Sequence, residues 1–114
     1  MTAFEPLAEL TDLPEGGLLA VRNAAGEAIC LANVRGEVSA LVDCCTHAEF
    51  PLSDGVIHAD GSVECVWHGA RFDCATGAVC KGPAVDGVVA YDVRVEGGKI
   101  LVGPRRPIGA EAAR

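Results

Sequence analysis

The chain has 114 residues, half of them hydrophobic, which is enough for one compact domain with a real core but not for two. Its net charge of -7 argues against a nucleic-acid partner, because nucleic-acid binders need a basic face. No apolar run is long enough to cross a membrane, and the N-terminus lacks the basic run and apolar core of a secretory signal. We therefore expect a cytoplasmic protein without a membrane partner.

The first part of the chain predicts a meander of short antiparallel strands. Residues 4–7, 18–23, 28–34 and 38–43 are apolar runs separated by turn-forming, glycine-containing stretches. Such runs are too short for stable isolated helices. Cys30 lies in the middle of the third run among aliphatic neighbours, so we expect it to be a buried structural thiol.

The second part continues the same pattern. Residues 56–57, 62–66, 71–73, 78–80, 85–95 and 99–102 predict further short strands. Cys74 and Cys80 flank a turn, where they could face each other, but we expect free thiols in a reducing compartment. Residues 104–114 contain two prolines and two adjacent arginines and predict a mobile tail. We therefore expect one domain over residues 1–103, followed by this tail.

Two short motifs interrupt the strands, and in each a cysteine precedes a histidine. They are Cys45-Thr46-His47 and Cys65-Val66-Trp67-His68. One intervening residue in the first motif is cramped for two bonds to a single tetrahedral zinc ion, whose ligand pairs are usually two to four residues apart. A 2Fe–2S centre relaxes this constraint, because two thiolates can bind one iron and two imidazoles the other. The spacing favours the iron–sulfur centre, and a zinc-stabilised interaction module is the alternative.

Residues beside the motifs receive more ordinary interpretations. Cys44 is adjacent to Cys45 but does not give the Cys-x-His spacing, and alternation of side chains would point it away from the metal. We therefore take it as a spare thiol, and Asp43 or Cys44 could help to shape the loop. His58 has no neighbouring cysteine and follows a short strand beside a turn, so we expect an ordinary surface residue.

With these motifs the chain resembles the Rieske family, and in particular its small bacterial ferredoxins. Gly82-Pro83-Ala84 is similar to the proline loop that covers the centre in that family, and the resemblance extends over about residues 4–103. It implies an all-β Rieske fold of three stacked antiparallel sheets, with a cluster-binding part over about residues 43–84 on a β base. It also implies one 2Fe–2S cluster with four ligands, which are Cys45, His47, Cys65 and His68.

The resemblance to dioxygenase ferredoxins implies a soluble carrier that takes single electrons from a flavin reductase and passes them to a terminal oxygenase. The chain offers no mononuclear iron triad of two histidines and a carboxylate beyond these ligands, so we do not expect an enzyme. A Rieske-like small subunit of an assimilatory nitrite reductase is the alternative within this chemistry. Some of those subunits lack the full ligand set, whereas this chain retains all four residues.

Charge and polarity around the motifs lead to two further expectations. High-potential relatives carry hydroxyl groups at the positions of Ala70 and Phe72. Alanine and phenylalanine cannot donate hydrogen bonds from their side chains, so we expect a reduction potential near the low end of the Rieske range, about -150 mV.

Five acids also lie in or beside the motifs with no basic residue between them, and these are Asp43, Glu49, Asp54, Asp60 and Glu64. They form either a solvated loop surface or a docking surface for a basic partner.

Overall fold

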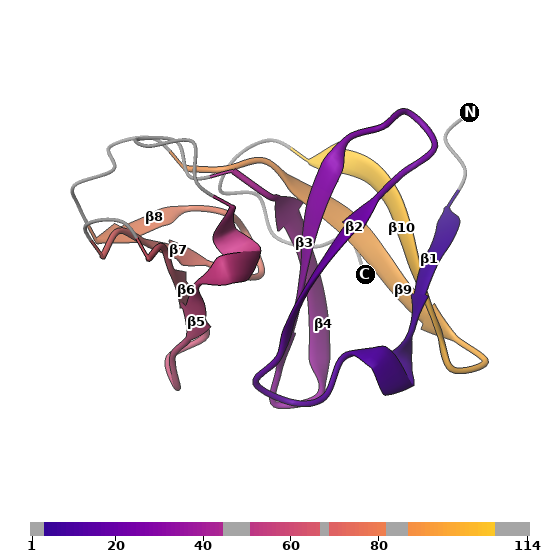
Figure 1. Cartoon of the computed structure of the whole chain (residues 1–114), viewed down its shortest axis with the longest axis horizontal. Helices are drawn as coiled ribbons and strands as arrows, with labels where there is room; N and C mark the ends of the chain where they lie inside the picture. Colours follow the sequence, from indigo (N-terminus) through magenta and orange to yellow (C-terminus); the bar gives the residue numbers. More distant parts are fainter. Residues whose placement is uncertain (1–3, 45–50, 67–68, 82–86, 107–114) are drawn as a thin grey trace.

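The computed structural model describes residues 4–44, 51–66, 69–81 and 87–106, which form two antiparallel sheets (Figure 1). The larger one, the base sheet, consists in spatial order of β1 (Glu5–Glu9), β10 (Lys99–Arg106), β9 (Ala90–Glu96), β4 (Glu37–Val42), β3 (Ala28–Val34) and β2 (Leu18–Arg22). The small sheet consists of β5 (Val56–Ile57), β6 (Ser62–Glu64), β7 (Arg71–Asp73) and β8 (Val79–Lys81). Two single-turn 3-10 helices are η1 (Leu10–Asp12) and η2 (Leu52–Asp54).

Strand β3 is buried on both faces and lies in the middle of the molecule. Because successive residues of a strand point to opposite sides, its side chains enter two separate cores. The base core, enclosed by the base sheet, comprises Leu13, Ile29, Leu31, Ala40, Tyr91, Ile100 and Val102. The interlayer core, between the base sheet and the small sheet, comprises Cys30, Ala32, Leu41, Leu52, Val63, Cys65, Ala70, Phe72, Cys74, Val88 and Ala90. Cys30 is fully buried there, as predicted.

The predicted all-β antiparallel fold is confirmed, but the strands are joined differently from the expected three sheets. Ala40 and Leu41 of β4 pair with Tyr91 and Ala90 of β9, so hydrogen bonding runs without a break through all the strands of the base. This sheet bends around the base core, and its two edge strands β1 and β2 contact each other. The molecule therefore has three layers, although its described strands form two hydrogen-bonded sheets.

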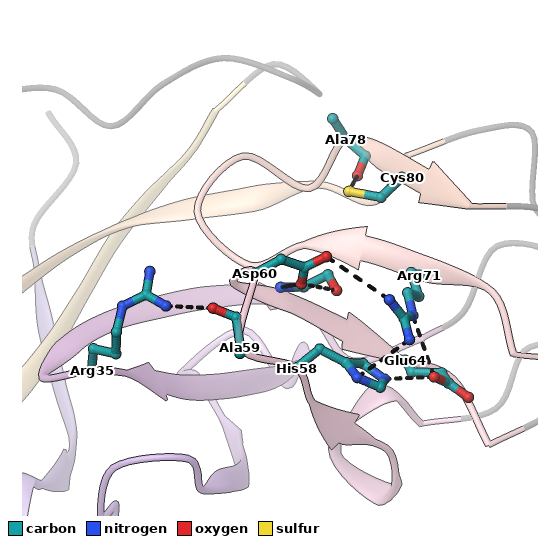
Figure 2. A network of polar contacts seen from close by, with 9 residues as sticks. Arg35, His58, Ala59, Asp60, Glu64, Arg71, Ala78 and Cys80 are labelled. Carbon is teal, nitrogen blue, oxygen red and sulfur yellow. Dashed lines mark hydrogen bonds and ion pairs between the residues drawn. The ribbon is translucent and has the colours of Figure 1, made fainter.

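The turn between β3 and β4 connects the base sheet to the small sheet. Arg35 and Gly36 form its two central residues, with φ angles of 53° and 92°. Both values are positive, as the two-residue hairpin turn that matches strand twist requires. The arginine is an uncommon residue in this conformation. Its Nη1 donates a hydrogen bond to the carbonyl oxygen of Ala59, in the turn between β5 and β6 (Figure 2).

Strand β10 continues to Arg106, so the prediction of a tail from residue 104 is wrong for residues 104–106. The reason is that Arg106 is buried and hydrogen-bonded: its Nη2 lies 2.9 Å from the carbonyl oxygen of Ala75 and 3.1 Å from that of Tyr91. Its Nε lies 3.2 Å from Oδ1 of Asp92. Residues 107–114, the rest of the predicted tail, lie outside the described residues. The part of the chain that the structure describes contains no helix able to span a membrane.

Candidate metal centre

The first ligand loop is closed at its base by Asp43. The predicted ligands Cys45 and His47 lie outside the described residues, whereas Asp43 before them and Ser53 after them are described. Oδ1 of Asp43 accepts the backbone N–H of Ser53 at 2.8 Å, and Oδ2 accepts the hydroxyl of Ser53 at 2.6 Å. The backbone N–H of Asp43 donates to Ala28 of β3 at 3.0 Å. Asp43 therefore helps to shape the loop, which was one of the two possibilities predicted for Asp43 and Cys44.

The second ligand loop begins at Cys65, the one predicted ligand among the described residues. Cys65 follows β6 directly and is fully buried. Its backbone N–H donates to the carbonyl oxygen of Ala70 at 2.8 Å, which extends the pairing of β6 with β7 by one step. Gly69 closes the loop with φ of 72°, in the left-handed region that favours glycine. His68 lies outside the described residues.

The fold brings the foot of the first loop beside the start of the second. Val56 of β5 pairs with Glu64 of β6, and a Cβ atom built on Gly55 would lie only 2.0 Å from the carbonyl oxygen of Glu64. The two segments are thus in such close backbone contact that a side chain at position 55 has no room. Leu52, which ends the first loop, belongs with Cys65 to the interlayer core.

The small sheet and its turns carry two further thiols, Cys74 and Cys80. Cys74 is buried in the interlayer core, whereas Cys80 is exposed, and neither forms a disulfide. The prediction of free thiols is confirmed, with one thiol in the core and the other exposed. Burial, with a smaller contribution from nearby Asp73, raises the pKa of Cys74 to about 12, so its thiol stays protonated at neutral pH.

Comparison with known proteins decides the family. The family model for the Rieske 2Fe-2S domain matches residues 3–92. The chain belongs to the Rieske family. The ferredoxin component of the p-cumate 2,3-dioxygenase system of Pseudomonas putida is 40% identical over 104 residues, which cover 90% of this chain and 86% of the relative. The 3-phenylpropionate/cinnamic acid dioxygenase ferredoxin subunit of Escherichia coli K12 is 40% identical over 93 residues, 82% of this chain and 86% of that one.

A solved structure agrees with these relatives. The ferredoxin of carbazole 1,9a-dioxygenase from Nocardioides aromaticivorans IC177 superposes with a TM-score of 0.83 and 38% identity, covering 90% of this chain and 98% of that one. The Rieske family match gives the cofactor as one Rieske-type 2Fe–2S cluster. Because its relatives are ferredoxin components of dioxygenase systems, this Rieske protein is an electron-transfer component rather than a catalytic enzyme.

The described part of the site fits a Rieske cluster. Cys65 places a thiol at the end of a strand, fully buried at the margin of an apolar core, where a metal-bound sulfur is shielded from water. The predicted proline loop, Gly82-Pro83-Ala84, lies outside the described residues. The chain after it is fixed by a hydrogen bond of 2.8 Å from the N–H of Val88 to the carbonyl oxygen of Gly77. The protein thus holds the base of each loop in place.

Sequence reasoning missed a polar network beside the second loop, because it treated His58 as an ordinary surface residue. The His58 side chain is only 31% exposed, and its Nε2 lies 2.6 Å from Oε1 of Glu64. Nη2 of Arg71 lies 3.3 Å from Nδ1 of the same ring. Since a guanidinium group can only donate, we assign Nδ1 as the acceptor and place the ring proton on Nε2. No sequence pattern indicated this network, because it depends on the cross-strand pairing of Glu64 with Arg71, two opposite charges at the loop base.

The carboxylates of the acidic stretch are engaged in more local hydrogen bonds than the sequence indicated. Asp60 accepts hydrogen bonds from the hydroxyl and the N–H of Ser62, at 2.6 and 3.0 Å, which together lower the pKa of its carboxyl group. Asp43 is engaged with Ser53, and Glu64 with the network just described. Asp54 is exposed, and Glu49 lies outside the described residues. Most of the described acids of this stretch therefore have local structural partners.

Proposed function

We propose that this Rieske ferredoxin is a soluble cytoplasmic carrier that takes single electrons from a flavin-dependent reductase and delivers them to a terminal oxygenase. The observation that supports it best is the identity of 40% to a dioxygenase ferredoxin component over nearly the full length of both chains. The geometry is compatible with this role, because the chain builds two adjoining loops at one side of a β scaffold.

We further propose that Cys45 and Cys65 ligate one iron and His47 and His68 the other. When bound, such a centre accepts and returns one electron, at a higher potential than a centre with four thiolates. The residues of the chain supply rigidity for this exchange. Asp43 holds the first loop through Ser53, and the Cys65–Ala70 hydrogen bond holds the second. Electron transfer then needs little rearrangement of the ligand loops.

The ligand set can be tested with the third histidine as a matched control. We expect His47→Ala and His68→Ala each to abolish the electron paramagnetic resonance signal of the reduced protein, while His58→Gln retains it. Iron and acid-labile sulfide should be present in about equal amounts in the wild-type protein and fall in the two ligand variants. Retention of the wild-type signal in either ligand variant would contradict the assignment.

The carrier role needs its own measurement with purified partners. A purified flavin-dependent reductase and a terminal oxygenase should be mixed with reduced nicotinamide cofactor, with and without the ferredoxin. We expect reduction of the oxygenase to depend on the ferredoxin and to be lost with His68→Ala. Equal reduction of the oxygenase without the ferredoxin would contradict the proposal.

A further inference from the structure

Glu64 is the centre of the polar network at the foot of the second ligand loop. Figure 2 shows its carboxylate in contact with both the ring of His58 and the guanidinium of Arg71. Both contacts are made by the same oxygen: Oε1 lies 2.6 Å from His58 Nε2 and 3.3 Å from Arg71 Nε. The guanidinium also reaches Oδ2 of Asp60 at 3.9 Å through Nη1. The position of the Glu64 side chain is therefore fixed by neighbours on two other segments of the small sheet.

The other carboxylate oxygen lies against the ligand loop. A Cβ atom built on Gly69 would lie 3.5 Å from Oε2 of Glu64. In addition, Glu64 and Arg71 are the last residue pair of the β6–β7 ladder, and the next hydrogen bond is the one between Cys65 and Ala70. The two charged residues thus stand directly at the entry and the exit of the loop.

Both charges are present at neutral pH. The carboxylate of Glu64 accepts hydrogen bonds from His58 Nε2 at 2.6 Å and from Arg71 Nε at 3.3 Å, contacts that stabilise its ionised form. Arginine is protonated at all physiological pH values. Each side chain is about one third exposed or less, so solvent and salt screen the two charges less than they screen fully exposed ones.

We propose that Glu64 and Arg71 set the reduction potential of the cluster in opposite directions, with Glu64 also positioning the second ligand loop. The proposal rests on the ligand set given above. An anion beside the centre opposes the arrival of an electron, and a cation favours it. Because the two residues adjoin the same loop, their effects largely cancel in the wild-type protein.

The test is the direction in which the reduction potential of the cluster shifts in single and double variants. Glu64→Gln should raise the equilibrium constant for reduction about threefold, which is about 28 mV at 59 mV per tenfold for one electron. Arg71→Gln should lower it by a similar factor, and the double variant should return close to wild type. Glu96→Gln and Arg94→Gln remove the same charges from β9 of the base sheet and should change the constant by less than about 1.5-fold.

Two further variants separate charge from position. Glu64→Gln keeps an oxygen that accepts the same hydrogen bonds, so the shape of the resonance signal should be unchanged. Glu64→Ala removes these contacts and should alter the signal as well as the potential. Arg71→Lys keeps the charge and should stay near the wild-type potential. If Arg71→Gln loses its cluster, the inference is tested by the reduction potential of Glu64→Gln alone. That potential should then be raised relative to the wild-type protein by more than the potential of Glu96→Gln is.

Failure of this inference is distinguishable from failure of the proposed ligand set. The inference would be overturned if the wild-type protein holds its cluster but the reduction potential shifts in the same direction in Glu64→Gln and Arg71→Gln. Shifts in potential no larger than those of the base-sheet controls would overturn it as well. Absence of the cluster from the wild-type protein, or its retention in His68→Ala, would instead overturn the ligand set.

Discussion

Asp43 uses one carboxylate to hold both polar groups of Ser53 across the first ligand loop. Asp43→Ala leaves the N–H of Ser53 without this acceptor, and we expect a loss of about 1–3 kcal/mol in the free energy of unfolding. Ser53→Ala removes only the hydroxyl and should cost about 0.5–1.5 kcal/mol. Chemical denaturation of the two variants measures the difference. Equal losses would show that the backbone hydrogen bond contributes nothing.

The potential of the cluster is a second prediction at the scale of single residues. Ala70 and Phe72 are both fully buried in the interlayer core and carry no hydroxyl group. We therefore expect a potential near the low end of the Rieske range, about -150 mV, in a redox titration followed by visible absorption. A clearly positive value would show that other groups supply the missing hydrogen bonds.

The thiols differ in reactivity because they differ in burial. Cys74, whose pKa is raised to about 12, and the buried Cys30 should resist alkylation at neutral pH, whereas the exposed Cys80 should react first. Peptide mapping after brief treatment with iodoacetamide of the folded protein with its cluster measures the order. Modification of Cys74 at the same rate as Cys80 would show that the small sheet opens readily.

The sequence predicts the ligand set from two Cys/His motifs and from the family resemblance that they carry, and this set stays a prediction because only Cys65 lies among the described residues. The network around Glu64 was not predicted, since it depends on which strand residues face each other. The pairing of Glu64 with Arg71 spans a loop, and His58 reaches them only because β5 and β6 form a hairpin. An isolated histidine beside a turn gives no sign of this arrangement.

At the scale of elements, short apolar runs located most strands well. The predicted strands over residues 28–34 and 71–73 agree with the bounds of β3 and β7. Of the extended stretch predicted over 85–95, residues 85–86 lie outside the described residues, and β9 begins at Ala90. The pairing of β4 with β9 joins segments far apart in the sequence, which no local pattern reveals. For the same reason the continuous base sheet was not predicted.

The end of β10 provides a prediction about stability. Arg106 is buried and donates to carbonyl oxygens in the turn after β7 and in β9. Deleting residues 104–114 should lower the free energy of unfolding by at least about 2 kcal/mol more than deleting residues 107–114, because hydrogen bonds from a charged donor contribute about 1.5–3 kcal/mol each. Urea denaturation compares the two truncations. Equal stability would show that Arg106 adds nothing.

At the scale of the whole molecule, the net charge of -7 should influence association with a basic partner. We expect the rate of electron delivery to the oxygenase to fall severalfold as ionic strength rises from about 0.01 to 0.15 M, where the screening length shortens from about 30 to 8 Å. Stopped-flow mixing of reduced ferredoxin with oxidised oxygenase measures this rate. Asp54→Asn, which removes one of the two exposed acids of the described acidic stretch, should lower the rate at low salt. A rate independent of salt would contradict charge-assisted docking.

The two arginines that link the layers have a consequence for how the protein meets its partners. Arg35 reaches from the β3–β4 turn to Ala59, and Arg106 reaches from the last strand to Ala75, so the small sheet is fastened to the base at two separate turns. We therefore expect the small sheet and the base sheet to move as one body. For the carrier role proposed above, the protein would then leave one partner and turn as a whole to present the same site to the next.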